Sequence, residues 1–504
     1  MKLKHLLGWS SALCLSASVL QAQETNDAEK LNKQLKQLQE KFEKQQQEMR
    51  DNFDRLLREQ QAQIEALKKQ LATQTNTAPA AAQPAASAPA QQPMTTPVTA
   101  IPGPDLARPW RPSDAIRLGG AQNFINLSFD ALVAAGASTA NDIDGPVPGA
   151  KLELGGHDPK QRGFTVQNLE TVFDGKVDPY FRGQANIVLQ IDPQGETTIE
   201  AEEAYLETMS LPWNLQVKAG QFFTEFGRLN PTHPHTWDFV DQPLVNGRFL
   251  GEDGLRSAGA RLSWLIPTPF YSELFMTIAN SQGGTAYSFR NEHEDVPFFG
   301  RPSTQGRVKS LGDMLFVPRY LASFNLSDSQ TLVAGASGAF GPNGTGGDTQ
   351  IYGVDLFYKW KSPHQHAGFP FVTWQTEGMA RRFHAGAFAG DAAALPPLAA
   401  LPAETLTDYG FYSQVGYGFR KGWVAAFRGD YAFPEKRGVY ETITGPDLER
   451  ASRWRLSPNL TYYPSEFSKI RLQYNFDHRN GVGDDHSVWM QFEFLLGTHA
   501  AHKF

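Results

Sequence analysis

The segment Pro231–Thr236 carries the side chains best suited to bind a metal ion. It reads Pro-Thr-His-Pro-His-Thr, so His233 and His235 stand two residues apart. Imidazole is a good ligand for zinc, copper and nickel. The spacing completes no ligand set, so a proline-stiffened surface loop with solvated histidines is the alternative. We therefore hypothesise a transition-metal site here, with zinc as the first candidate, and expect no other cofactor.

The loop that contains these histidines, residues 223–251, also carries charges of both signs. The candidates for a constriction are Arg228, Asp238, Asp241 and Arg248. Acidic and basic side chains that face each other across a pore bias which ions pass. This interpretation requires a pore, so the elements that flank the loop must show whether the chain can form one.

Short alternating stretches fill the sequence from residue 113 onward. Ile125, Leu127 and Phe129, for example, alternate with polar residues, which is typical of a strand with one apolar face. About sixteen such stretches have the ~10-residue length of a tilted transmembrane strand. Short connections, such as residues 267–269 and 420–422, alternate with long ones, such as 280–314 and 434–450. Residues 113–504 are therefore predicted to form an all-β transmembrane barrel of about 16 antiparallel strands.

Three segments of different composition precede the predicted barrel. Residues 1–22 place basic residues before a short apolar run, as a secretory signal peptide does. In residues 27–73, apolar residues step mostly by four and three, which predicts an α-helical coiled coil that self-associates. Residues 74–112 are rich in alanine and proline and predict an extended linker. Cys14, the only cysteine, lies inside the signal, so the mature chain has no thiol.

Strand parity predicts which charges face the lumen. If the apolar residues face lipid, those of opposite parity face water. The basic candidates for pore lining are Arg182, Lys218, Arg261, Lys359, Arg428, Arg453, Arg455 and Arg471. The acidic ones are Asp130, Asp355, Asp430, Asp477 and Glu493. Basic residues outnumber acidic ones in this set, which predicts a weak anion preference. The alternative is that the charges pair across strands and leave the pore unselective.

Two segments resemble a known family. Residues 218–230, with a Gly-Gln-Phe strand end before an aromatic-Gly pair, resemble the strand-to-loop passage of the phosphate-selective porin O and P family, and residues 459–474 resemble its late hairpin. The terminal Phe504 is similar to the C-terminal aromatic read by barrel-assembly machinery. The resemblance implies a sixteen-stranded trimeric barrel with a third long loop that narrows the pore. The ladder of basic residues that gives the family its phosphate selectivity cannot be recognised in this sequence. Residues 497–503, before Phe504, are less apolar than the usual end of the last strand in this family.

These patterns predict a porin in a Gram-negative outer membrane, through which small hydrophilic solutes or ions diffuse passively. The expected partners are the lipid bilayer, lipopolysaccharide, two further copies of the chain and, through the periplasmic coiled coil, peptidoglycan. An envelope tether and a zinc-related transport protein or receptor are the alternatives. No compact nucleophile and base stand together, so an enzyme is not expected. A net charge of −7 without a basic aromatic stripe also speaks against nucleic-acid binding.

Overall fold

The computed structural model describes residues 116–119, 123–140, 155–159, 162–176, 178–191, 195–290, 298–303, 306–394 and 397–497. The predicted signal peptide, coiled coil and linker, together with the terminal Phe504, lie outside these residues.

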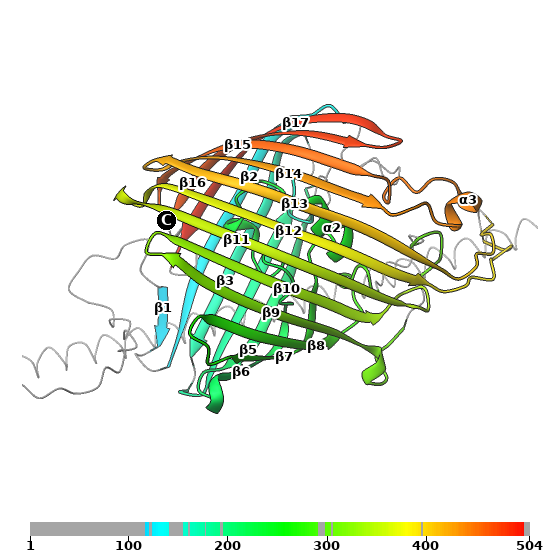
Figure 1. Ribbon diagram of the computed structural model, residues 1–504, viewed down its shortest axis with the longest axis horizontal. Coiled ribbons are helices and arrows are strands. Elements are labelled where there is room, and N and C mark those ends of the chain that lie inside the picture. Colours follow the sequence, from blue (N-terminus) through cyan, green and yellow to red (C-terminus); the bar gives the residue numbers. More distant parts are fainter. Residues whose placement is uncertain are drawn as a thin grey trace, which may run out of the picture. The chain divides into compact units, whose positions relative to one another are not determined.

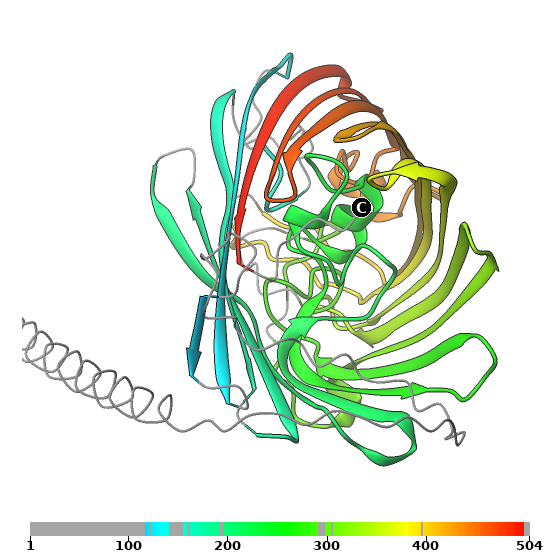
Figure 2. The same ribbon diagram turned by 90° about the vertical axis from the view of Figure 1, so that its left-hand side faces the viewer.

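Sixteen antiparallel strands of the described chain form one closed sheet (Figures 1 and 2). They are β2 (Phe124–Ser138), β3 (Gly163–Lys176), β4 (Phe181–Ile191), β5 (Thr197–Thr208), β6 (Leu215–Phe223), β7 (Arg256–Leu265), β8 (Tyr271–Asn280), β9 (Met314–Ser327), β10 (Gln330–Pro342), β11 (Asp348–His366), β12 (Phe369–Ala385), β13 (Glu404–Arg420), β14 (Trp423–Pro434), β15 (Arg453–Ser465), β16 (Ser468–Arg479) and β17 (Gly483–Leu496). Each strand pairs with its neighbours in sequence, and β17 pairs with β2 to close the ring. The predicted strand number is confirmed.

A seventeenth strand, β1 (Ile116–Gly119), extends the seam of the barrel. The pairing of β17 with β2 ends where Leu496 lies opposite Phe129. Directly beyond it, Ile116 of β1 lies opposite Leu127 of the same strand. Strand β1 therefore occupies the edge of β2 that β17 leaves unpaired, and it satisfies backbone groups that a sheet edge would otherwise expose.

The connections also follow the predicted alternation. At one rim they are short turns, for example residues 328–329, 367–368 and 421–422. At the other rim, long stretches of sequence separate the strand ends, namely residues 139–162, 224–255, 281–313, 386–403 and 435–452. Three shorter connections, residues 192–196, 343–347 and 480–482, share that rim. This asymmetry is typical of porin-like barrels.

Side-chain burial along the strands is inverted relative to a soluble protein. In β17, Val488, Met490 and Phe492 are exposed, whereas Gln491 and Glu493 are buried. Exposed aromatic side chains also gather beside the short turns: Tyr180, Trp213, Tyr271, Tyr417 and Tyr462. An apolar outer face with an aromatic girdle suits lipid, and a polar inner face suits water. The chain is thus a porin-like β-barrel.

This orientation predicts that a charge on the outer face is costly. Met490 lies near the middle of β17, opposite Leu472 of β16, and points outward. We expect Met490→Arg to lower the free energy of unfolding by about 2–4 kcal/mol, because lipid cannot hydrate the guanidinium. Urea unfolding in lipid vesicles measures this, with Met490→Leu as the control. Equal stability of the two variants would contradict the assigned outer face.

The described helices are short: η1 (Pro212–Asn214), η2 (Pro234–Thr236), α2 (Leu244–Leu250), η3 (Leu311–Asp313) and α3 (Tyr440–Thr444). Among the described residues, no helix has the length and hydropathy of a membrane-spanning helix. Helix α2 lies inside the ring of strands (Figure 2), and all of its residues are buried. Gly251, with φ 104°, ends it. Its apolar side chains meet the barrel wall in one core cluster with Phe226, Ile351 and Tyr412.

Candidate functional site

The loop between β6 and β7, residues 224–255, folds into the barrel and starts at a fixed turn. Gly227 has φ 62°, and a Cβ there would come within 2.1 Å of the Glu377 carboxylate. The buried Glu377 on β12 accepts hydrogen bonds from the backbone N–H groups of Arg228 and Leu229, at 3.1 and 2.8 Å, and from the hydroxyl of Tyr412. The carboxylate therefore holds the root of the loop against the wall.

One side of the barrel presents four buried carboxylates to this loop, which we call the acidic wall. They are Asp130 on β2, Glu170 on β3, and Glu202 and Glu203 on β5. Neighbouring residues of a strand normally face opposite sides of the sheet. A bulge breaks this rule in β5, since Asn186 pairs with Glu203 and Ile187 with Ala201, which leaves Glu202 between them. Glu202 and Glu203 consequently both face inward.

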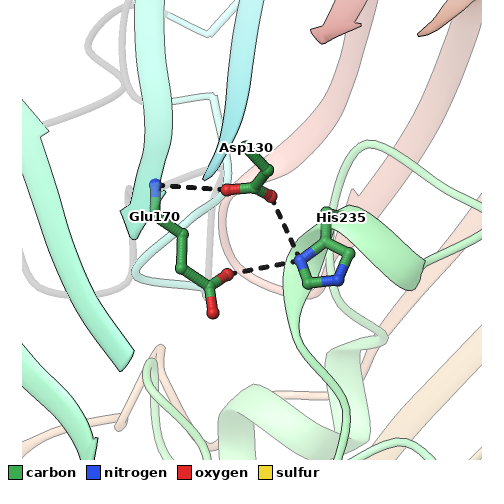
Figure 3. A group of neighbouring side chains, drawn as sticks. All are labelled: Asp130, Glu170 and His235. Carbon is green, nitrogen blue, oxygen red and sulfur yellow. Dashed lines mark hydrogen bonds and ion pairs between the residues drawn. The ribbon is translucent and has the colours of Figure 1, made fainter. Parts of the chain in front are cut away.

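His233 and His235 of the loop insert into the acidic wall (Figure 3 shows His235 with Asp130 and Glu170). The Nδ1 atom of His233 lies 2.8 Å from Oε2 of Glu202 and 3.3 Å from Oε1 of Glu170. Its Nε2 atom is 2.9 Å from Oε2 of Glu203. Both histidines are buried, so the alternative of a surface loop with solvated histidines is wrong.

His235 makes the equivalent approach from the same loop. Its Nδ1 atom lies 3.1 Å from Oδ2 of Asp130 and 3.2 Å from Oε2 of Glu170. Glu170 thus offers one carboxylate oxygen to each histidine. The two imidazole rings stack with centroids 5.9 Å apart.

The acidic wall shifts the titration of both loop histidines. Burial by itself lowers the pKa of His235, but hydrogen bonds and charge from Asp130 and Glu170 outweigh it and raise the pKa to about 9. Burial likewise opposes the charged form of His233, yet Glu170 and Glu202 raise its pKa well above the ordinary value. The site therefore strongly favours a positive charge at each imidazole.

The opposite side of the lumen is basic, and the same loop reaches it through Asp241. The carboxylate of Asp241 accepts hydrogen bonds from Arg428 at 2.6 Å and Arg455 at 3.0 Å. Gln473 and Asn475 of β16 donate to it at 2.9 and 2.8 Å. Burial raises the pKa of Asp241, but the two guanidinium groups outweigh burial and lower it. The loop is therefore complementary in charge to both walls.

Most of the predicted lumen arginines point inward as expected but are already paired. Arg453 and Arg455 bind Asp477, Arg428 binds Asp430 as well as Asp241, and Arg261 binds Glu225. Arg471 donates to Thr461, Gln491 and the carbonyl of Trp237. Most of the predicted basic lumen residues therefore follow the alternative expectation, in which lumen charges pair with one another. Their partners lie on the loop as well as on neighbouring strands.

The remaining candidates differ in their surroundings. Arg182 lies at the short-turn rim, 3.6 Å from Glu207, and Arg248 donates to backbone carbonyls near the long-loop rim. Lys218, Arg228 and Lys359 face the lumen half-buried, and in the described part of the chain none has a carboxylate within 4.0 Å. Arg228 stacks on Phe357 at 3.8 Å.

The carboxylate of Asp238 is exposed toward the lumen. Its side chain accepts a hydrogen bond from Gln414 at 3.3 Å, and its backbone carbonyl accepts one from Asn459. Of the constriction candidates, Arg228 and Asp238 therefore remain in contact with the lumen, whereas Asp241 and Arg248 are buried.

Several solved structures share the barrel fold with this chain. An outer membrane channel, DcaP of Acinetobacter baumannii, is 12% identical with a TM-score of 0.47, covering 75% of this chain and 99% of that one. OmpF of Salmonella typhi, solved with daunomycin, is 11% identical with a TM-score of 0.42, and the match covers 75% of this chain and 100% of OmpF. OprB of Pseudomonas putida is 9% identical with a TM-score of 0.42, and the match covers 73% of this chain and 93% of OprB.

The sequence comparison finds a nearer relative, although no family model matches the chain. An uncharacterized protein of Aquifex aeolicus (strain VF5) is 32% identical over 384 residues, which is 69% of this chain and 73% of the relative. The chain belongs to the same family as this Aquifex aeolicus protein.

Proposed function

We propose that the protein is a porin of a Gram-negative outer membrane that lets small hydrophilic solutes diffuse passively, with a weak preference for anions. The observation that carries the proposal is the inverted barrel. Met490 and Phe492 face outward, while Gln491 and Glu493 between and beside them face the interior. A closed sheet with a charged interior and an apolar exterior is suited to hold water inside a bilayer.

The loop 224–255 sets the dimensions of the proposed path. It occupies the lumen from the acidic wall to the basic wall, so solutes must pass beside it. A polar cleft of about 470 Å³ runs along its edge, lined among others by Glu200, Arg256 and Gln282. The proposed constriction is therefore this loop.

The anion preference rests on the lumen charges that keep no ionic partner. Lys218 and Lys359 are half-buried on the inner face of β6 and β11, and Arg228 is half-buried on the loop. The deeper arginines are neutralised by Asp241, Asp430 and Asp477 and contribute little net charge. These three cations are the charges by which the pore would favour anions.

The assembly follows from the sequence before the barrel. The coiled coil at residues 27–73 would join three chains in the periplasm and contact peptidoglycan, with residues 74–112 as its linker. Lipopolysaccharide would surround the outer half of the barrel. The signal at residues 1–22 would direct export.

Recording in planar bilayers tests the function. The purified mature protein should insert with conductance steps in groups of three and with a reversal potential shifted toward anions in a salt gradient. Phosphate and organic anions are the first solutes to test. Folding is checked by heat-dependent migration in gels. A folded barrel without conductance would overturn the proposal.

The free lysines give a sharper test of selectivity. We expect the double variant Lys218→Glu and Lys359→Glu to shift the anion-to-cation permeability ratio toward cations by about tenfold, since a charge reversal at ~5 Å in water changes the energy of a passing ion by ~1–2 kcal/mol. Lys421→Glu, in a short turn, is the control. An unchanged reversal potential in the double variant would show that solutes do not pass these residues.

A further inference from the structure

The cluster between the loop and the acidic wall contains more negative charge than its own imidazoles can balance. Asp130, Glu170, Glu202 and Glu203 contribute four carboxylates, against His233 and His235. His157 adds a third imidazole, 3.4 Å from Glu202. The nearby ammonium of Lys469 is engaged with Glu493 and with the carbonyl of His235. Even with all three imidazoles protonated, one buried negative charge is left over, and an unbalanced buried charge is costly.

Glu170 accepts hydrogen bonds from Asn186 and Asn168, but two other ligand atoms approach each other without a regular hydrogen bond. Nδ1 of His233 and Oε2 of Glu202 are 2.8 Å apart, yet neither atom has a hydrogen-bond partner in the described structure. The two side chains are only 9% and 2% exposed. Atoms that approach each other in this way, without the alignment of a hydrogen bond, point to a common centre. Ligand atoms around a tetrahedral ion with ~2.0–2.1 Å bonds lie about 3.3 Å apart, close to the distances seen here.

Glu203 supplies the support that a metal-binding imidazole normally has. Its carboxylate accepts the Nε2–H hydrogen bond of His233 at 2.9 Å. This hydrogen bond places the other ring nitrogen, Nδ1, toward Glu170 and Glu202. In the neutral imidazole, that nitrogen is a lone pair facing two carboxylates, an arrangement that either a proton on Nδ1 or a metal cation between them stabilises. A carboxylate behind the ring is the usual outer partner of a zinc-bound histidine.

Glu170 connects this group to a second one. His235 Nδ1, Asp130 Oδ2 and Glu170 Oε2 lie within 4.8 Å of one another, as do His233, Glu202 and the other oxygen of Glu170. Oδ2 of Asp130 contacts Nδ1 of His235 at 3.1 Å. One carboxylate with an oxygen in each of two neighbouring ligand groups has the arrangement of a bridging ligand.

We propose that the cluster binds a divalent transition-metal ion of the zinc class through His233, Glu170 and Glu202, with Glu203 orienting the imidazole. His235 and Asp130 form an adjoining position that shares Glu170. Nitrogen and oxygen ligands without thiolate suit zinc, manganese or nickel. The ligands come from the loop and from two strands of the wall, so the ion ties the constriction loop to the barrel. Metal binding goes beyond the proposed diffusion function. It is measured separately from conductance, so either proposal can fail without the other.

Zinc binding to the full-length mature protein tests the proposal. The detergent-solubilised protein is dialysed against a chelator and then against Zn(II), and bound zinc is counted by mass spectrometry. We expect at least one zinc per chain. Co(II) should bind in its place and give visible d–d absorption of a low-symmetry site. Glu170→Gln, which keeps the shape and removes the charge, should weaken zinc binding by more than ~100-fold, and Glu203→Gln by about 10–100-fold.

The control is His478→Gln, which removes an exposed histidine paired with Asp484 and should leave zinc binding unchanged. Heat-dependent gel migration shows whether each variant folds. If Glu170→Gln does not fold, Glu203→Gln and the Co(II) spectrum of the unmodified protein decide. Two results would overturn the proposal: the folded unmodified protein binds no zinc, or the folded Glu170→Gln or Glu203→Gln variant binds zinc as well as the unmodified protein does. Either result would assign the cluster to ion pairs between imidazolium and carboxylate.

Discussion

Replacing Asp241 by alanine is expected to lower the free energy of unfolding by about 3 kcal/mol and to raise single-channel conductance. Asp241 is buried between Arg428 and Arg455, and removing one member of a buried ion pair typically costs about 3–5 kcal/mol. The lower end applies because Arg428 keeps Asp430 and Arg455 keeps Asp477. The loop would lose its contact with the basic wall, and the pore would widen.

Urea unfolding in lipid vesicles and bilayer recording measure the two effects. Asp238→Ala is the matched control, because Asp238 lies three residues earlier on the same loop but is exposed. We expect its effect on stability to be within about 0.5 kcal/mol. Equal effects of the two substitutions would show that the contact of Asp241 with the basic wall does not hold the loop.

The same contact predicts how stability depends on pH. The folded protein lowers the pKa of Asp241 below the ordinary value of about 3.9 for an aspartate in an unfolded chain. A lowered folded-state pKa gives stability that is fully present above the unfolded pKa and is lost as the pH falls through the folded pKa. The unmodified protein should therefore lose stability below about pH 4, and Asp241→Ala should lose less of it.

The strands could be predicted from the sequence because one physical constraint acts along the whole barrel. Every spanning strand must show lipid an apolar face, so the period of two recurs from β2 to β17. Strand β1 was missed, because Ile116–Gly119 has only four residues. Its place depends on where β17 stops pairing, which local alternation does not reveal.

Parity predicts on which side of a strand a charge lies, but it does not predict the partner of that charge. Arg428, Arg455 and Arg471 face inward as expected. The partner of Arg428 and Arg455, however, is Asp241, which lies 187 residues before Arg428 on a loop whose path inside the barrel is set by packing. Local periodicity contains no information about such a contact, so the basic lumen was overestimated.

The candidate metal cluster was found only in part for a related reason. The His-Pro-His segment drew attention to His233 and His235, but Glu170, Glu202 and Glu203 were not among the candidates. Strict alternation would place Glu202 and Glu203 on opposite faces, and only the bulge opposite Asn186 turns both inward. The run of acidic residues at 200–203 was the one available signal, since charges on a lipid-facing side are rare.

The root of the constriction loop carries the second large effect. Replacing Glu377 by alanine is expected to lower the free energy of unfolding by about 3 kcal/mol, because the N–H groups of Arg228 and Leu229 lose a charged acceptor and each such loss costs about 1–3 kcal/mol. The loop would then move away from β12 at its start. Conductance should rise and fluctuate more between levels.

Tyr412→Phe separates the role of the carboxylate from that of its neighbour. This substitution removes the hydrogen bond from the tyrosine hydroxyl to Glu377 but keeps the carboxylate that holds the loop. We expect a cost of about 1 kcal/mol and unchanged conductance. If Glu377→Ala and Tyr412→Phe alter conductance equally, the hydrogen bond from the Tyr412 hydroxyl is what holds the Glu377 carboxylate at the loop root. If Glu377→Ala alone releases the loop, its backbone contacts set the width of the pore.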